Sequence, residues 1–277
     1  MDRIGTYHIK PFSTARKNIS LIIKEGWKKH TIHALIEIDV TNGKKQLKKY
    51  TEQTGEKLSF TGWIITCAAK ALSEHKEINA IRKGRNKIIY FDDVDVPIPV
   101  ERTMDGEKVP MAYILRKANE KNLLEITKEI RSVQQQNVQG SKQVLGTEFT
   151  LLEKIAFKSP MFLKKILLFL VQHSPLLKKK HMGTLGVTAV GMKGKFPGWI
   201  IPLGGTTTIL FVIGGIIKKP GVTENDAITV RDIIHVTVAV DHDLIDGGPL
   251  GRFLERFIDL CDQAYGIPQI NQEKNEK

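Results

Sequence analysis

One histidine, His242, stands in the sequence D-H-D-L-I-D-G, with Asp241 and Asp243 on either side and Asp246 four residues later. Imidazole has an unperturbed pKa of about 6.5, so it can accept and return a proton near neutral pH. Such a side chain suits a general base that takes a proton from an attacking nucleophile. A single histidine beside a strand is more often structural than catalytic, so its setting decides the interpretation.

The elements around His242 favour a reactive site. Residues 233–240 are apolar and mostly β-branched, which predicts a buried strand that ends just before the histidine. The run Asp246-Gly247-Gly248-Pro249 is typical of a helix start. Apolar residues then recur at helical spacing up to Cys261. The strand therefore fixes the backbone, while the loop leaves the imidazole reachable.

Composition sets limits on the class of protein. The chain has 277 residues, of which 41% are hydrophobic and 26% charged, and its net charge is +12. We expect one catalytic domain over residues 1–270 and a polar tail over 271–277. The basic balance favours anionic partners, but no stacking aromatics or helix-turn-helix pattern indicates nucleic acid. Cys67 and Cys261 have no metal-ligand spacing and are expected to be buried thiols, which favours a reducing cytoplasm.

The remaining segments alternate irregularly between strands and helices. Period-two or apolar runs predict strands at residues 34–40, 87–90, 94–100, 109–115, 183–192 and 206–216, the last followed by a turn at 218–221. Asp105-Gly106 is a turn signal between two of these strands. Helical spacing predicts helices at 43–56, 58–74 and 122–133. This order indicates a mixed sheet covered by helices rather than a doubly wound nucleotide-binding fold.

The motif D-H-x-x-x-D-G after an apolar strand resembles the active-site signature of the acyltransferase component of 2-oxo-acid dehydrogenase complexes, a signature shared with chloramphenicol acetyltransferase. The likeness extends over most of the chain. The block from Lys57 to Pro110, with Asn79 and the D-G…V-P hairpin, is similar to that family. The strand G-T-L-G-V-T-A-V-G occupies the place of the family's G-T-F-T-x-S-N-x-G strand, so Thr188 takes the position of the active-site serine.

The resemblance implies a two-layer α+β sandwich with a mixed sheet of the chloramphenicol acetyltransferase type, forming homotrimers with the active site between subunits. Coenzyme A would enter from one side and the acyl acceptor from the other. His242 would be the base, and the Thr188 hydroxyl would stabilise the oxyanion. Asp246, supported by Gly247, would hold its loop by pairing with an arginine near the N-terminus, for which Arg16 is the candidate.

The sequence also departs from this family. No lipoyl-bearing domain precedes the catalytic part, so we expect a lipoyl group to act only in trans, on a separate lipoyl or acyl carrier protein, if at all. The family's serine-asparagine pair is Thr188-Ala189 here, and Asp243 replaces the usual arginine after the histidine. The alternative to an acyltransferase is a catalytically idle trimeric or cage subunit of a similar complex. The combination of His242, a hydroxyl at position 188 and Asp246 argues against that alternative.

A helical insertion is expected at residues 140–181, where the family has a short connection. Prolines at 160 and 175 predict breaks between its helices. Residues 161–171 are almost wholly apolar apart from Lys164 and Lys165. This stretch is either a helical hairpin packed on the trimer surface or an apolar, cationic lid that admits an acyl chain or contacts an anionic membrane.

Overall fold

The computed structural model describes residues 5–104, 107–135, 159–191, 196–223 and 225–269. The α-helices in this part are α1 (Thr14–Gly26), α2 (Thr41–Thr54), α3 (Phe60–Glu74), α4 (Leu123–Gln135), α6 (Met161–His173), α7 (Pro175–Met182) and α8 (Gly247–Asp262). The strands are β1 (Thr31–Asp39), β2 (Ala80–Lys83), β3 (Lys87–Tyr90), β4 (Val96–Met104), β5 (Glu107–Leu115), β6 (Leu185–Ala189), β7 (Ile209–Val222) and β8 (Ile228–Asp241).

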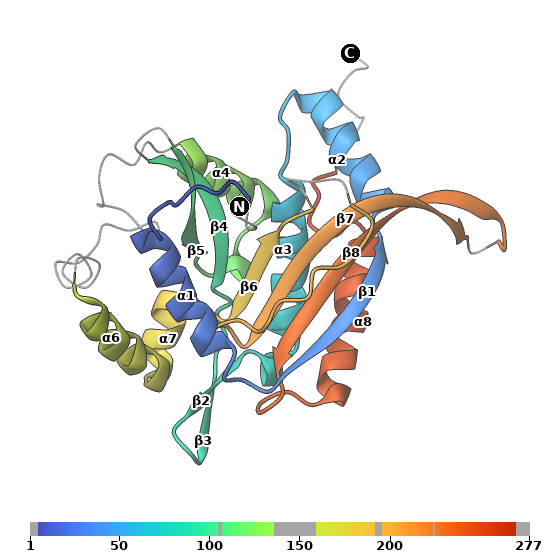
Figure 1. Ribbon diagram of the computed structural model, residues 1–277. Coiled ribbons are helices and arrows are strands. Elements are labelled where there is room, and N and C mark those ends of the chain that lie inside the picture. The colour runs from blue at the N-terminus through green and yellow to red at the C-terminus, as the bar shows by residue number, and fades with distance from the viewer. Residues whose placement is uncertain (1–4, 105–106, 136–158, 192–195, 224, 270–277) are drawn as a thin grey trace.

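The central sheet has the strand order β1-β8-β7-β6 (Figure 1). β6 runs parallel to β7, and the other neighbours are antiparallel. α3 and α8 cover one face of this sheet, and the sheet and these helices enclose the main core. At its centre, the ring of Phe211 meets Phe253 and Phe257 edge-on, with centroids 6.0 and 5.0 Å apart. The mixed sheet with helices on one face is the two-layer arrangement expected from the sequence.

A glycine contact positions α2 against α3. Gly43 in α2 lies against the fully buried ring of Trp63 in α3, and a Cβ at this glycine would lie 2.1 Å from a ring carbon. The indole N–H of Trp63 donates to the backbone oxygen of Tyr265, just beyond α8. Trp63 thus joins three segments of the helical layer, and only a residue without a side chain fits at position 43.

The β4–β5 hairpin lies beside β6, and α7 is fastened to it by Asp95 (Figure 1). The buried carboxylate of Asp95 is 2.9 Å from Arg116 and 3.5 Å from Lys179 of α7. Arg116 also donates to the backbone oxygens of Lys179 and Lys180. The end of the insertion is therefore anchored by ion pairs, although the preceding α6 has no buried residue.

One turn prediction is wrong. Residues 218–221 are not a turn but part of β7, which pairs with β8 as far as Val222↔Ile228. Pro220 lies opposite Val230 of β8. In the described part, β7 has no other strand beside it at this point, so the missing N–H of the proline leaves no hydrogen bond unmade on the other side. The chain reverses instead between Thr223 and Ala227, whose backbones are hydrogen-bonded. The result is a long two-stranded ribbon that extends beyond the sheet (Figure 1).

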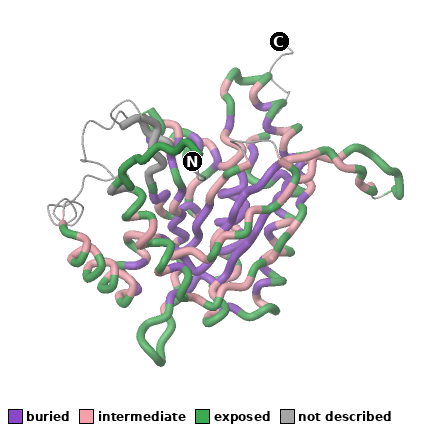
Figure 2. The backbone as a smooth tube through the Cα atoms, viewed as in Figure 1, coloured by how far each residue is buried: buried purple, intermediate pink, exposed green. Residues whose placement is uncertain are grey.

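The other predicted elements that fall in the described part are confirmed, with shifted ends: the strands β1, β3–β8 and the helices α2, α3, α4 and α8. Pro175 begins α7 and separates it from α6 as expected, and Pro160 directly precedes α6. The turn at 105–106 and the start of the insertion, up to residue 158, lie outside the described residues. Figure 2 shows the buried residues concentrated in the sheet and in the helices behind it. None of the described helices is long and apolar enough to cross a bilayer.

Candidate active site

His242 follows the last residue of β8, where its backbone is still fixed to β1. Its N–H donates to the carbonyl oxygen of His30 over 2.8 Å, which continues the β1–β8 register by one residue. Its side chain is 44% exposed. The loop then turns through hydrogen bonds from Leu244 and Ile245 to the carbonyl of Asp241, and Ile245 is buried. A fixed backbone with an accessible ring is the setting that the sequence predicted for a base.

Asp246 places a carboxylate near the imidazole of His242. Its Oδ1 lies 3.7 Å from Nδ1 of His242, which is too long for a hydrogen bond, and its side chain is 87% exposed. It occupies the N-cap position of α8, but its side chain makes no capping hydrogen bond. The carboxylate is thus free to take another partner in an assembly.

A largely buried lysine, Lys29, contacts the residue that precedes this loop. Nζ of Lys29 donates to the carbonyl oxygens of Thr206 and Thr207 over 3.1 and 2.6 Å, and it lies 3.7 Å from Oδ2 of Asp241. Burial lowers the pKa of Lys29 to about 7, with a smaller lowering by Lys178 and an opposing effect of Asp241. Lys29 therefore connects the start of β1, the segment before β7 and the residue that precedes His242.

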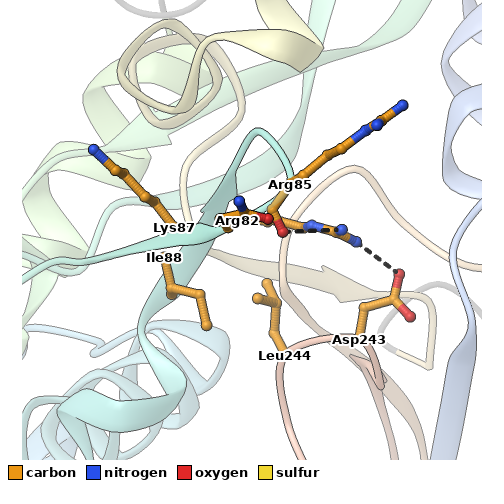
Figure 3. Close-up of a pocket in the computed structure, with 7 residues that line it drawn as sticks. Arg82, Arg85, Lys87, Ile88, Asp243 and Leu244 are labelled. Atoms are coloured by element: carbon orange, nitrogen blue, oxygen red, sulfur yellow. Dashed lines mark hydrogen bonds and ion pairs between the residues drawn. The ribbon is translucent and has the colours of Figure 1, made fainter.

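A basic pocket opens beside the His242 loop. It has a volume of about 390 Å³ and is lined by the β2–β3 hairpin and by the loop residues Asp243 and Leu244 (Figure 3). The hairpin contributes Arg82, Arg85 and Lys87. The guanidinium of Arg82 is 3.9 Å from Asp243, and the lining of the pocket contains three cationic side chains and one carboxylate. The surplus of positive charge suits an anionic ligand.

Asp243 is also held by His30. Nδ1 of His30 is 2.9 Å from Oδ1 of Asp243, and this hydrogen bond raises the pKa of His30. Asp243 therefore links the loop to β1 through His30 and to the β2–β3 hairpin through Arg82. Asp243, which stands where the family usually has arginine, therefore connects the His242 loop to the pocket.

Thr188 lies in β6, opposite Val212 of β7, which is in turn opposite Thr237 of β8. It is half-buried, and its hydroxyl has no hydrogen-bond partner among the described residues. Its neighbours Leu185 and Val187 belong to the core, so alternation turns Thr188 to the face of the sheet away from α3 and α8. Its hydroxyl is therefore available to a ligand or to another chain.

The register separates Thr188 from His242 within one chain. The row that contains Thr188 crosses β8 at Thr237, five residues before His242. Five residues of strand span roughly 17 Å, and two strand spacings add about 10 Å sideways, so the two Cα atoms are roughly 20 Å apart. Counted in steps of two along β8, His242 is on the same face as the core residues Val238 and Val240. Thr188 is on the opposite face. A single subunit does not bring these side chains together.

The two supporting residues are not engaged in the single chain. Arg16, in the first turns of α1, is exposed and forms no ion pair with Asp246 in the structure as described. Gly247 begins α8, has no positive φ, and would meet no atom within 4 Å if it carried a Cβ. The Arg16–Asp246 pair and the role of Gly247 remain predictions.

Sequence reasoning missed Lys29, His30 and the arginines of the β2–β3 hairpin. The signal for the hairpin was present as the basic run R-K-G-R-N-K, which alone is typical of a solvated surface. No signal identified Lys29 or His30, because their partners are more than a hundred residues away along the chain. Cys67 and Cys261 are buried thiols, as expected. Within the part of the chain that the structure describes, no group of His, Cys, Asp and Glu could hold a metal ion.

Comparisons with known proteins identify the family and the fold. The profile of the 2-oxoacid dehydrogenases acyltransferase (catalytic domain) family matches residues 5–152 and 177–266. The lipoamide acyltransferase component of the branched-chain alpha-keto acid dehydrogenase complex of Bacillus subtilis is 27% identical over 252 residues, which cover 89% of this chain and 50% of that protein. The chain thus spans about half the length of this relative.

Two solved structures have the same fold. The dihydrolipoamide acetyltransferase of Azotobacter vinelandii superposes with a TM-score of 0.69 at 15% identity, covering 96% of both chains. The cubic core of a pyruvate dehydrogenase multienzyme complex superposes with a TM-score of 0.67, also at 15% identity and 96% of both chains. The expected fold class is confirmed by these cores. The chain, matched over most of its length, belongs to the family of 2-oxoacid dehydrogenase acyltransferase catalytic domains.

Proposed function

We propose that the protein is a coenzyme A-dependent acyltransferase that moves an acyl group between a thioester and a thiol or other nucleophile, with His242 as general base. The observation that carries this proposal is the accessible imidazole of His242, fixed through its backbone to His30 at the edge of a basic pocket. Membership of the acyltransferase family supports the reaction type.

The reaction follows from these side chains. His242 takes the proton of the attacking thiol, and the sulfur bonds to the carbonyl carbon of the thioester. The carbonyl oxygen becomes an oxyanion, to which the hydroxyl of Thr188 donates a hydrogen bond. When the intermediate collapses, the original carbon–sulfur bond breaks and the leaving thiolate takes the proton from the imidazolium. Atoms and charge balance without a metal or an external oxidant.

The basic pocket is the proposed site for the phosphates of coenzyme A. Arg82, Arg85 and Lys87 offer cations next to the loop of His242, and an arginine can hold a phosphate through two parallel hydrogen bonds. Figure 3 shows the guanidinium of Arg82 directed towards Asp243. The pantetheine arm would then run from this pocket towards the imidazole.

The separation of Thr188 from His242 supports a site shared between subunits. Because about 20 Å separates them in one chain, Thr188 can act near the imidazole only if it belongs to a second copy. Exposed apolar residues that suit an interface lie in β1, in the segment before β7 and in the β7–β8 ribbon: Leu35, Ile201, Leu203, Val222, Ile228 and Val230. We infer a homotrimer, alone or within a larger cage. In that assembly we expect Arg16 to pair with Asp246, whose carboxylate is otherwise exposed.

The acyl acceptor is proposed to be a dihydrolipoyl group or an acyl carrier thiol on a separate protein. Two of the proteins named above belong to multienzyme complexes, and the Bacillus protein is called a lipoamide acyltransferase component. These names make a lipoyl group a candidate acceptor.

The direct test is acyl exchange between acetyl-, isobutyryl- or succinyl-coenzyme A and free dihydrolipoamide, comparing the wild-type protein with His242→Ala. Removing a general base is expected to lower the rate by about 10²–10⁴-fold. His75→Ala is a matched control, because His75 is another partly exposed imidazole, at the C-terminal end of α3. Equal rates for the wild-type protein and His242→Ala would favour the alternative, a catalytically idle assembly subunit.

A further inference from the structure

We propose that α6 docks on the surface of an anionic membrane, with its bare apolar face in the headgroup region. The feature behind this proposal is independent of the active site. α6 (Met161–His173) lies at the periphery of the molecule, next to α7 and α1 and away from the central sheet (Figure 1). It is apolar on both sides, but only one side is covered by the rest of the chain.

The uncovered side is a continuous stripe. Phe162 is 66% exposed, Ile166 50%, Phe169 57% and Leu170 52%. Positions that recur at i, i+4, i+7 and i+8 share one face of a helix, within an arc of about 100°. The apolar residues of the other side, among them Leu167, Leu168 and Val171, are half-buried. A helix of 13 residues spans only about 20 Å, so it fits an orientation along a bilayer rather than across it.

Charge around the stripe favours an anionic surface. Between Ser159 and Met182 the sequence contains five lysines and no aspartate or glutamate. Lys165 is exposed and lies about 60° from Phe162 around the helix, at the edge of the stripe. Lys180 of α7 and Lys17 of α1 are also exposed, and Lys164 ties α6 to α1 by donating to Asn18 over 3.3 Å. Apolar anchors bordered by lysine are the composition of interfacial helices.

The stripe is not part of the common fold. The family profile matches residues 5–152 and 177–266, so the intervening segment that contains α6 has no counterpart in it. An interface common to the family therefore does not account for the exposed side chains. Ion pairs of Lys179 with Asp93 and Asp95 nevertheless hold the following α7 firmly to the body. Because α7 is fixed to the body of the protein, the adjoining α6 can bind a membrane without disturbing the catalytic domain.

The test is sedimentation of the full-length protein with vesicles of phosphatidylcholine alone and with vesicles that contain about half phosphatidylglycerol, at about 50 and 300 mM salt. The expected result is binding to the phosphatidylglycerol vesicles that weakens at the higher salt, with little binding to phosphatidylcholine. Vesicle-bound protein should also shield Phe169→Cys from a water-soluble thiol reagent, while Lys49→Cys on the exposed side of α2 stays reactive.

Two variants separate the apolar and the charged contributions. Phe162→Ser/Phe169→Ser is expected to weaken vesicle binding roughly tenfold or more, and Lys165→Glu roughly tenfold. Lys49→Glu is the matched control, because it makes the same change of charge on an exposed position of α2 and should leave most of the binding intact. All three variants alter exposed positions and should keep the wild-type melting temperature.

The proposal is overturned by an absence of vesicle binding at both salt concentrations, or by binding that persists in both α6 variants. It is equally overturned if Phe169→Cys is unreactive in the free protein and becomes reactive on dissociation of the oligomer, because a second copy then covers the stripe. None of these readouts depends on catalysis, so they distinguish failure of this proposal from failure of the proposed acyl transfer.

Discussion

Thr188 and His242 lie about 20 Å apart in one chain and on opposite faces of the sheet, because the row of Thr188 crosses β8 at Thr237, five residues before the histidine. A base and an oxyanion donor for one reaction must be within a few ångströms of the same carbonyl group. If both act in catalysis, each active site combines residues from two subunits.

The first prediction is complementation between subunits. Thr188→Ala and His242→Ala should each be nearly inactive, but mixed oligomers formed by co-expression should contain sites with both wild-type residues. Every trimer that contains both variants has one complete site out of three, which gives roughly a third of the wild-type activity. The measurement is thioester exchange by purified mixed oligomers that carry two different affinity tags. Activity no higher than that of the separate variants contradicts a shared site.

The second prediction concerns the hydroxyl at position 188. Thr188→Val keeps the shape of the side chain but removes the donor, so kcat should fall by about 10²–10³-fold. Thr188→Ser keeps the donor and should retain activity within about an order of magnitude. The wild-type hydroxyl has no partner among the described residues, so neither change should lower the melting temperature appreciably. Full activity of Thr188→Val would remove Thr188 from the mechanism.

The third prediction concerns the basic pocket. Arg85→Glu should raise the KM for acyl-coenzyme A by roughly tenfold or more and leave kcat within about twofold, because a phosphate contact far from the reacting carbonyl stabilises ground and transition states alike. The KM of the wild-type protein should also rise with salt. Lys49→Glu on α2 is the control for the change in net charge. An unchanged KM with Arg85→Glu would place the cofactor elsewhere.

The fourth prediction follows from the pKa of Lys29, which burial lowers from 10.5 to about 7. Between pH 7 and 10.5 the unfolded chain holds a proton at Lys29 that the folded protein has released, so this residue makes the protein more stable as the pH rises. Below pH 7 the contribution is constant. Lys29→Met, which cannot titrate, should flatten the rise of unfolding free energy across this window. Urea unfolding at several pH values measures the slope, and an unchanged slope would contradict the lowered pKa.

The fifth prediction compares two glycines. Gly43→Ala would place its Cβ 2.1 Å from the ring of Trp63, so it should destabilise the protein by about 1–3 kcal/mol. Gly247→Ala meets no atom within 4 Å and should leave the melting temperature unchanged. Any loss of activity in Gly247→Ala would then report a contact made only in the assembly or with substrate. Thermal unfolding of both variants under identical conditions makes the comparison.

Local chemistry in the sequence determined most of the elements and the identity of the candidate base. The apolar run before His242 could only be a buried strand, and the Asp-Gly-Gly-Pro run after it had to start a helix, because both signals act over neighbouring residues. The same reasoning failed at residues 218–221. A proline and a glycine there read as a turn, but a strand with a neighbour on one side only tolerates both.

Tertiary structure decided the surroundings of the site. Lys29 meets Thr206, Thr207 and Asp241, and Asp243 meets His30 and Arg82, across separations in sequence that no local pattern encodes. The sheet register, which depends on pairing between distant strands, set the distance between Thr188 and His242. The sequence named the reactive side chains because chemistry belongs to residue types, whereas their separation in one subunit depended on how distant strands align.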